Sequence, residues 1–404
     1  MGMTLAEKKK KLDKLAEQFN KQKGKTLIGR LSECEDLQNQ LKMQFVETPS
    51  LKVNAALGGG WPKGRITIVA GNPDSGKTFM LLETIAINMK KNPDFIAAWL
   101  ESEQSVSEKD FEMFGIDTSR LFFLNPDTLG GAEEAIDAVQ SALLTCEIDM
   151  FVINSLKCLV PKEELDSSMT KLQVGLQARM NAKMIRKLTS IISEQNCAFI
   201  MVQHLTTQIG GMIFGDPLII GGGKAIMYGA SIICDMRKLS IQQTDPISKE
   251  EGVKISFTVK KNHVVTDKYP YVKTEYYGIF GQGTERYLEI IDLAINEGIL
   301  VKSGAFIKMP DENGDPQVIN GEKMQWQGNS KFRQYCIEHE DFFNQLKDMV
   351  TNGNVNDSLE TLSDEEVEEI KEAEKNLELA VKEEHLDEDI IEKSKSKKKD
   401  KQEG

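Results

Sequence analysis

Apolar residues follow two alternating patterns through the middle of the chain. Short apolar runs, "RITIVA", "FIAAWLE", "DMFVINS" and "AFIMVQH", are separated by stretches of helical periodicity such as "TFMLLETIAINMKK". Runs that are apolar on both faces are typical of parallel strands covered by helices. The pattern predicts an α/β fold with a mostly parallel sheet, to which "ASIICDMRKL" and "VKISFTVKKNH" add later strands.

The pattern changes at both ends of the chain. Residues 5–23 predict a lysine-rich amphipathic helix with Leu5, Leu12, Leu15 and Phe19 on one face, and this helix has no obvious partner within the chain. After about residue 286 a compact mixture of helices and turns predicts a small α+β domain. The predicted divisions are an N-terminal oligomerisation helix and linker (1–38), an α/β core (39–285), a small C-terminal domain (286–352) and a disordered tail, acidic and then lysine-rich (353–404).

The net charge of −13 is distributed unevenly. Residues 357–392 contain sixteen acids and three lysines, a balance of −13, and residues 393–404 contain six lysines and two acids, a balance of +4. Residues 1–356 therefore carry only −4. The acidity belongs to the tail, so the charge of the whole chain does not exclude a folded part that binds nucleic acid.

Neither a membrane nor a metal cluster is indicated by the composition. No apolar window approaches the length of a membrane span, and the N-terminus opens on the charged "EKKKKLDK", so we expect a cytoplasmic protein without a signal peptide or a membrane partner. The six cysteines are scattered without a CxxC pair, and there are only four histidines. We interpret the cysteines as reduced packing residues.

The most specific motif is "GNPDSGKT", residues 71–78, which matches G-x-x-x-x-G-K-[ST] between a predicted strand and a predicted helix. Gly71 and Gly76 let the backbone curl so that its N–H groups converge on a β-phosphate. Lys77 reaches the β and γ oxygens, and the Thr78 hydroxyl can ligate Mg²⁺. The motif predicts a site for a nucleoside triphosphate, made by Gly71, Asn72, Pro73, Asp74, Ser75, Gly76, Lys77 and Thr78.

Polar residues at the ends of three further strands are candidates for the chemistry, because ligands of such sheets bind at the carboxyl ends of the strands. "WLESEQ" places Glu101 and Glu103 on one side, where a carboxylate can polarise an attacking water. "VINS" ends in Asn154, where many P-loop enzymes carry an aspartate near Mg²⁺, and we expect Glu101 or Glu103 to supply the missing charge. The predicted metal site is Thr78, Asn154 and Glu101. Gln203 in "MVQH" can touch a γ-phosphate and report its loss, although a polar residue at a strand end is by itself more often an ordinary one.

Two segments suggest contacts with DNA. "HLTTQIGGMIFGDPLIIGGGKAIMYGAS", residues 204–231, packs seven glycines and several apolar residues into a long, poorly periodic stretch. Ile213 and Phe214 could insert between the bases of a single strand while glycine N–H groups contact phosphates; a buried hairpin is the alternative. Arg179 and Arg186 fall on one face of a predicted helix, where they form either a DNA contact or a solvated surface.

The order of these motifs resembles the bacterial RecA recombinase family from about residue 10 to about residue 350. "GNPDSGKT", "ESEQ", "VGLQARM", "IFGDP", "GGKAIMYGAS", "KKNH", "LEIIDLAINEGIL" and "GEK" stand where that family has similar stretches. "AEQFNKQKGKTLIGRL" is similar to the family's N-terminal helix and the strand after it. The resemblance implies a RecA-like P-loop NTPase core.

The resemblance also implies an activity: an ATP-dependent DNA recombinase that forms helical filaments on single-stranded DNA and exchanges strands with duplex DNA in recombination and repair. It implies that Glu103 activates the attacking water, while Lys77 binds the phosphates. It also implies that Gln203 couples the γ-phosphate to DNA and that Lys261 reaches the nucleotide of a neighbouring subunit. The DNA-binding residues that the resemblance implies are Arg179, Arg186, Phe214, Gly215, Gly222 and Gly223, with residues 204–229 as a DNA-binding loop. The apolar Ile213 of the glycine-rich segment completes the predicted set.

The chain departs from the family's pattern at several positions. Asn154 replaces the Walker B aspartate, His263 stands where an interface lysine is expected, and Asp110 stands where the family has a tyrosine against adenine. Such departures suit a divergent, for example phage-encoded, member. Two alternatives stay open: a hexameric helicase-type ATPase with a RecA-like core, which is not expected to share "GGKAIMYGAS", and a nucleotide-dependent DNA-binding protein that does not hydrolyse ATP, which Asn154 makes plausible.

Overall fold

The computed structural model describes residues 3–24, 26–125, 130–168, 175–207, 218–245, 250–264, 271–319, 321–353 and 359–372. The chain divides into two compact units, Met1–Gln44 and Phe45–Gly404, so the first unit ends six residues later than the predicted boundary at residue 38. Among the described residues, no helix has the length and apolar character needed to cross a membrane.

The first unit contains the predicted amphipathic helix, α1 (Leu5–Lys23), which starts with a capping box between Thr4 and Glu7. A 3₁₀ turn (Leu31–Glu33) and α2 (Glu35–Leu41) follow. The strand implied after α1 is not formed: the backbone N–H groups of Leu27 and Ile28 donate to the side chain of Asn20 instead. A strand needs a partner strand to satisfy its backbone groups, and the described part of this unit provides none.

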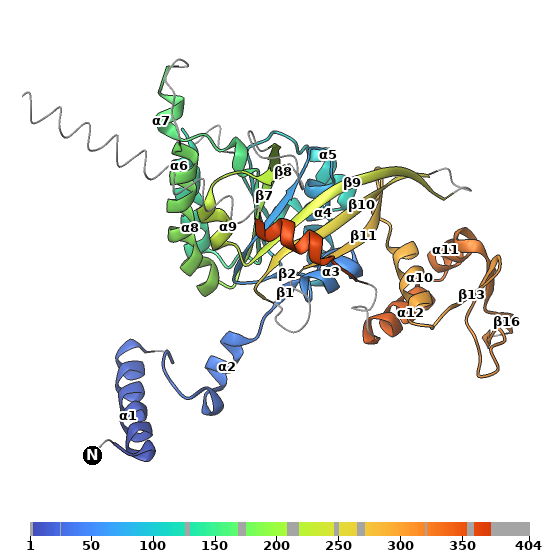
Figure 1. Ribbon diagram of the computed structural model, residues 1–404, viewed down its shortest axis with the longest axis horizontal. Coiled ribbons are helices and arrows are strands. Elements are labelled where there is room, and N and C mark those ends of the chain that lie inside the picture. Colours follow the sequence, from blue (N-terminus) through green and yellow to red (C-terminus); the bar gives the residue numbers. More distant parts are fainter. Residues whose placement is uncertain are drawn as a thin grey trace, which may run out of the picture. The chain divides into compact units, whose positions relative to one another are not determined.

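The second unit is built on a mixed sheet in the order β12-β11-β10-β9-β3-β7-β6-β4-β5 (Figure 1). Every pairing from β9 to β5 is parallel, and those from β9 to β12 are antiparallel. The predicted α/β fold with a mostly parallel sheet is thereby confirmed. The strands of this sheet are β3 (Arg65–Gly71), β4 (Ala97–Glu101), β5 (Leu121–Leu124), β6 (Met150–Asn154), β7 (Ala198–Thr207), β9 (Ile232–Asp245), β10 (Glu250–Asn262), β11 (Val272–Ile279) and β12 (Gly283–Thr284).

Helices cover both faces of the sheet, each over its own hydrophobic core. α4 and α3 pack over one core with Trp99, Val152 and Phe257. α6, α8 and α9 gather on the other side (Figure 1), over a core with Leu100, Phe151 and Met201. The bounds are α3 (Leu51–Leu57), α4 (Lys77–Lys91), α5 (Glu108–Phe114), α6 (Ala132–Thr145), α7 (Lys162–Leu165), α8 (Leu176–Glu194) and α9 (Lys224–Gly229), with the short strands β1 (Phe45–Val46), β2 (Trp61–Pro62) and β8 (Leu218–Ile220).

The C-terminal part forms the predicted small α+β domain with a core of its own, centred on Ile291, Trp326 and Phe332. It is tied to α3 through Glu289, whose buried carboxylate accepts hydrogen bonds from the Ser50 hydroxyl at 2.5 Å and the Lys52 amide at 2.9 Å. Its elements are α10 (Arg286–Asn296), β13 (Val301–Ser303), β14 (Phe306–Lys308), β15 (Val318–Ile319), β16 (Glu322–Lys323), β17 (Gln325–Gln327), α11 (Gly328–Glu338) and α12 (Glu340–Asn352).

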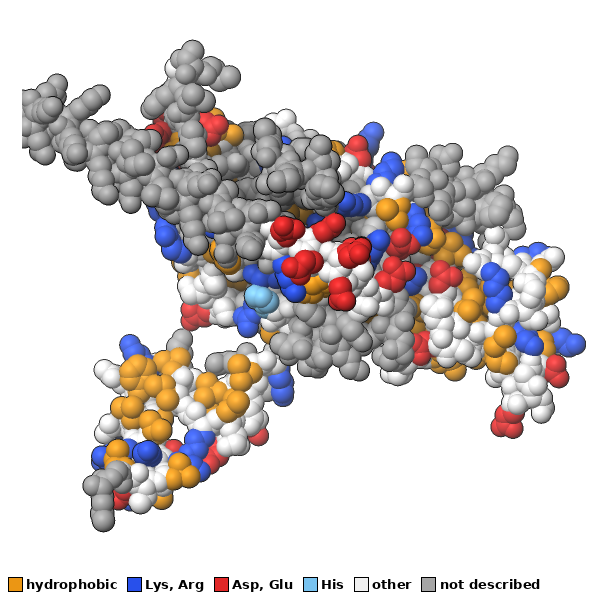
Figure 2. Space-filling model, viewed as in Figure 1, with side chains coloured by type: hydrophobic (Ala, Val, Ile, Leu, Met, Phe, Trp, Pro, Cys, Tyr) orange, Lys and Arg blue, Asp and Glu red, His pale blue; other side chains and the backbone are white. Residues whose placement is uncertain are grey.

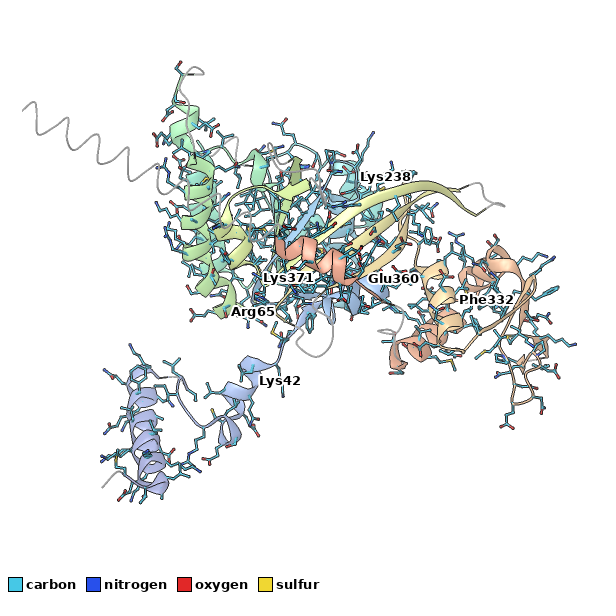
Figure 3. The ribbon with its side chains drawn as sticks, in the orientation of Figure 1. Lys42, Arg65, Lys238, Phe332, Glu360 and Lys371 are labelled. Carbon is cyan, nitrogen blue, oxygen red and sulfur yellow. The ribbon has the colours of Figure 1, made fainter. Side chains whose placement is uncertain are left out.

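The expected disordered tail begins with an ordered segment, residues 359–372, which corrects the prediction for these residues. β18 (Glu360–Thr361) pairs with the start of β11, which the short strand β12 leaves as a free edge, and Leu359 packs against the core on the α4 face. A helix over residues 364–372 follows, with acidic side chains gathered on its exposed surface (Figure 2); Glu360 and Lys371 mark the segment in Figure 3. An edge strand offers unpaired backbone groups, and this segment satisfies part of them.

Candidate functional site

The loop between β3 and α4 has the backbone shape that its two glycines permit. A side chain at position 71 would place its Cβ 2.7 Å from the hydroxyl oxygen of Ser75 and closer still to the carbonyl oxygen of Met236. Gly76 caps the N-terminus of α4 at φ 87°, a left-handed conformation that glycine adopts without strain. The loop therefore curls tightly against β9 and opens α4 with its amides exposed to the loop.

Lys77 lies inside this curl. Its Nζ donates hydrogen bonds to the carbonyl oxygen of Asn72 at 2.7 Å and to the hydroxyl oxygen of Ser75 at 3.3 Å. Burial lowers the pKa of Lys77, and nearby carboxylates, Glu103 first, act in the opposite direction. A bound anion would likewise favour the charged ammonium. The positive end of the α4 dipole, at the N-terminus of the helix, would also attract such an anion.

The other predicted nucleotide-binding residues surround Lys77. Asn72, Pro73 and Asp74 are exposed, and Thr78, the second residue of α4, is half-buried. Asp74 adopts φ 59°, which turns the loop backbone so that consecutive amides can converge on one ligand. The loop thus has the form and charge to hold a polyphosphate.

The ends of β3, β4, β6 and β7 direct alternate residues to opposite faces of the sheet. The core on the α4 face contains Val69, Trp99, Val152 and Val202. Two positions further along these strands come Gly71, Glu101, Asn154 and His204. These residues consequently share the face of the P-loop. Gln203 points to the opposite face, which α8 and α9 cover.

Glu101 and Asn154 form a buried pair on the P-loop face. The Asn154 Nδ2 donates to Oε2 of Glu101 at 2.9 Å and to Oγ of Ser105 at 3.0 Å. The Glu101 carboxylate also accepts from Nε1 of Trp99 at 2.8 Å and from the backbone amides of Glu103 and Ser105, each at 3.1 Å. Glu101 is therefore occupied by protein donors, which differs from the direct metal ligand expected from the sequence. It places its charge next to the Asn154 amide instead.

Asn154 has the chemistry of a Mg²⁺ site. Its Oδ1 is buried and, among the described residues, has no hydrogen-bond partner. An amide oxygen can accept a hydrogen bond from a metal-bound water or bind the ion directly, so Asn154 and the Thr78 hydroxyl fit as the residues that would hold Mg²⁺ with a nucleotide. The ion would supply positive charge to the phosphate oxygens.

Replacing Asn154 with aspartate is expected to destabilise the protein without Mg²⁺ and to strengthen its response to the ion. The new carboxylate would stand about where Nδ2 now lies, 2.9 Å from Glu101, and like charges so close repel. We expect a cost of about 2 kcal/mol from the lost hydrogen bond to a carboxylate. Thermal unfolding with and without Mg²⁺ and nucleotide, together with the Mg²⁺ concentration for half-maximal hydrolysis, measures both effects.

The matched control for that change is Asn181→Asp, on the other face of the sheet. Asn181 is equally buried, and its Nδ2 donates to the carbonyl oxygen of Gly222 at 2.9 Å. It should lose stability without regaining it on adding Mg²⁺. Mg²⁺ should stabilise Asn154→Asp more than it stabilises the wild type. If the two proteins gained equal stability from Mg²⁺, Asn154 would have no part in a metal site.

Glu103, the predicted water-activating residue, lies on the loop after β4 and is close enough to act on the charge of Lys77. Its Oε1 is hydrogen-bonded to Nε2 of His204. His204 is not among the site residues predicted from the sequence, although it directly follows Gln203 on β7. Asp235, also unassigned, is buried on β9 opposite Ala70 and pairs with Arg237 at 2.7 Å.

Gln203 lies on the α8 and α9 face, beside the glycine-rich segment. A Cβ added to Gly222 would lie 3.4 Å from Nε2 of Gln203 and 3.3 Å from Nδ2 of Asn181. The Gln203 Oε1 is buried and has no hydrogen-bond partner among the residues described. The side chain therefore faces the predicted DNA-binding segment, while a contact with a γ-phosphate stays a prediction.

The predicted DNA-binding loop starts as a hairpin, in which β7 pairs with β8, Leu205 opposite Ile220. Ile213, Phe214 and Gly215 lie outside the described residues. Gly222 and Gly223 take φ values of 99° and 89°, and a Cβ added to Gly223 would lie 2.9 Å from the Cβ of Ala178 on α8. The glycine segment thus packs directly on α8.

Exposed cations form a stripe on α8. Arg179 and Arg186 lie on the exposed face as predicted, and Lys183, which is not among the predicted residues, lies between them. The signal was available, since residues four and three apart share a helix face. No acidic partner is recorded for these three residues within the described chain, whereas Lys187 pairs with Asp137 at 2.7 Å. The stripe offers unneutralised positive charge beside Gly223.

Lys261 and two departures from the family's pattern are also placed by the structure. The Lys261 Nζ donates to the carbonyl oxygen of Met227 at 2.8 Å, at the end of α9, and its reach to a neighbour's nucleotide stays a prediction. His263 is exposed. Asp110 accepts hydrogen bonds from the amide and hydroxyl of Ser107 at 2.7 Å and so serves the capping box of α5.

Comparison with known proteins places the chain in a family. A sequence model described as the RecA N-terminal domain matches residues 10–285. The chain is 34% identical over 344 residues to Protein RecA of Dichelobacter nodosus, covering 84% of this chain and 91% of that protein. It is 30% identical over 351 residues to Protein RecA of Aquifex aeolicus, covering 87% of this chain and 94% of that protein. The chain therefore belongs to the RecA family.

Proposed function

We propose that this protein is an ATP-dependent DNA recombinase that assembles as a helical filament on single-stranded DNA and pairs and exchanges it with a duplex. The observation that carries the proposal is the part of β7 where its pairing with β3 ends. Gln203 faces the glycine segment and the cationic helix α8, and the next residue, His204, contacts Glu103 beside the P-loop. One strand therefore connects a candidate DNA face with a candidate ATP site.

The ATP half of the proposal follows from charge and position. Lys77 and the amides of α4 bind the phosphates, and Glu103 accepts a proton from the water that attacks the γ-phosphorus. The DNA half rests on glycine backbone and on Arg179, Lys183 and Arg186, which can contact backbone phosphates regardless of base sequence. A change at Gln203 on DNA binding would reach Glu103 through His204, the next residue on β7, which contacts Glu103.

The proposal of a filament is based on the first unit. The apolar face of α1 has no partner among the described residues of that unit. Leu5, Leu12 and Leu15 are 70%, 63% and 53% exposed. A contact that places this face on a different surface of the next subunit does not close on itself and generates open helical polymers.

Deletion of residues 1–44 is accordingly expected to leave monomers that bind nucleotide as tightly as the full chain. Sedimentation of the two proteins with and without ATP measures assembly. Leu12→Glu should weaken assembly, whereas Lys10→Gln, which changes the charge equally on the opposite helix face, should not. Polymers of undiminished length in the deletion protein would contradict this role.

The test of the proposed function is strand exchange by the purified chain with ATP and Mg²⁺, between circular single-stranded DNA and a homologous linear duplex. We expect joint molecules with homologous but not with unrelated duplex. Electron microscopy of the same mixtures distinguishes filaments from the rings of a helicase-type ATPase. Single-turnover hydrolysis distinguishes a recombinase from a DNA-binding protein that does not hydrolyse ATP, the alternative that Asn154 makes plausible.

A further inference from the structure

His204 and Glu103 form a contact that the fold specifies. The hydrogen bond between Nε2 of His204 and Oε1 of Glu103 joins residues 101 positions apart in the sequence. The two side chains retain only 15% and 20% of their exposed area. Exposed ion pairs contribute little because water competes for both partners, and this pair is largely shielded from that competition.

The pair stands next to the P-loop. In the register of β3 and β7, His204 lies opposite Gly71, the first glycine of the motif. Glu103 lies close enough to Lys77 to raise the pKa of that ammonium against the effect of burial. Glu103 follows the end of β4 on an irregular segment, so an unrestrained carboxylate could turn toward Lys77 and neutralise it. The contact with His204 provides an alternative partner.

The other ring nitrogen indicates which form of His204 makes this contact. Nδ1 is buried and has no hydrogen-bond partner among the described residues. An imidazolium would bury a second N–H without an acceptor, which is costly. A neutral ring that donates Nε2–H to Oε1 leaves only the Nδ1 lone pair without a partner among the described residues, and it buries no additional N–H or charge. Glu103 then keeps its negative charge, and its second oxygen, Oε2, is left for water.

We propose that His204 is a positioning residue for ATP hydrolysis, which holds Glu103 so that Oε2 meets the attacking water. The inference rests on the proposed ATPase function. The oxygen of the water forms the new bond to the γ-phosphorus, and the bond to the β–γ bridging oxygen breaks with its electron pair on ADP. The proton of the water passes to Oε2 of Glu103 and from there to solvent. His204 neither gains nor loses a proton in this step.

Three variants of the full chain test the inference. His204→Leu keeps much of the volume and removes the donor. His204→Gln keeps an N–H donor at about the reach of Nε2, and His204→Asn keeps a donor one methylene too short. We expect His204→Leu and His204→Asn to lower kcat for ATP hydrolysis about tenfold or more, the effect of losing a hydrogen bond to a charged group. His204→Gln should keep most of the wild-type kcat.

The split between kcat and binding separates positioning from a structural role. These measurements use a saturating deoxythymidine oligonucleotide and Mg²⁺. KM for ATP and the affinity for a non-hydrolysable ATP analogue should change less than about twofold in all three variants, because the contacts that bind the nucleotide equally in the ground state and the transition state are unchanged. Parallel losses of kcat, nucleotide affinity and melting temperature would show that His204 only supports the fold, and would overturn the inference.

The remaining outcomes are equally decisive. A His204→Leu protein with wild-type kcat overturns the inference. If that variant does not fold, the comparison of His204→Gln with His204→Asn decides, and equal rates for these two polar side chains overturn it. A wild-type chain that hydrolyses no ATP overturns the proposed function itself, and this failure appears before any variant is compared.

Discussion

Replacing Lys77 with alanine is expected to weaken ATP binding by at least about 100-fold, since a buried ammonium makes charge-assisted hydrogen bonds with phosphate that are worth about 3 kcal/mol. Lys77 is 5% exposed and lies within the loop that curls around it. Titration with a fluorescent ATP analogue measures the loss.

The control for this change lies on the same helix. Lys90→Ala removes the same charge from an exposed position near the C-terminal end of α4, away from the phosphates. It should leave nucleotide affinity unchanged within about twofold, as expected for a screened surface charge. Wild-type ATP affinity and DNA-stimulated hydrolysis in Lys77→Ala would refute the assignment of this loop as the phosphate site.

Replacing Glu103 with glutamine is expected to suppress hydrolysis by about 100-fold or more, the typical contribution of a general base, and to preserve ATP-dependent DNA binding. Glutamine keeps an oxygen that can accept the hydrogen bond from His204, so the local arrangement survives. It cannot take a proton from water. Single-turnover hydrolysis and DNA binding by fluorescence anisotropy, both with ATP, measure the two properties in the same preparation.

Glu112→Gln serves as the control for Glu103→Gln, because it removes an exposed carboxylate from the nearby helix α5. Its hydrolysis rate should equal that of the wild type. Loss of DNA binding together with hydrolysis in Glu103→Gln would mean that Glu103 supports the nucleotide-bound conformation rather than the chemistry. Full activity would move the role of base to another residue.

Much of the candidate ATP site is predictable from local sequence. Gly71, Gly76 and Lys77 belong to one continuous motif, whose glycines permit one backbone path between a strand and a helix. The ends of the apolar runs identify Glu101 and Asn154 as strand ends, whereas β7 continues past Gln203 to Thr207. Local patterns of this kind suffice because consecutive residues restrict each other's backbone directly.

Contacts between strand ends are not predictable in the same way. Alternation shows that Gln203 and His204 point to opposite faces, but only the packing of α4 and α8 decides which face holds the P-loop. The hydrogen bonds of Glu101 with Asn154 and of Glu103 with His204 depend on the order of β3, β4, β6 and β7 in the sheet. That order is decided by contacts between residues far apart in sequence.

The sequence by itself determined the α/β class, the P-loop motif and the amphipathic helix α1, because each depends on the spacing of residues that are close together in the sequence. The tertiary structure alone decided that Glu101 holds Asn154, that His204 holds Glu103, and that residues 359–372 pair with β11. In each of these cases a polar group or a strand edge needed a hydrogen-bond partner. Which partner it found depended on the fold that brought distant segments together.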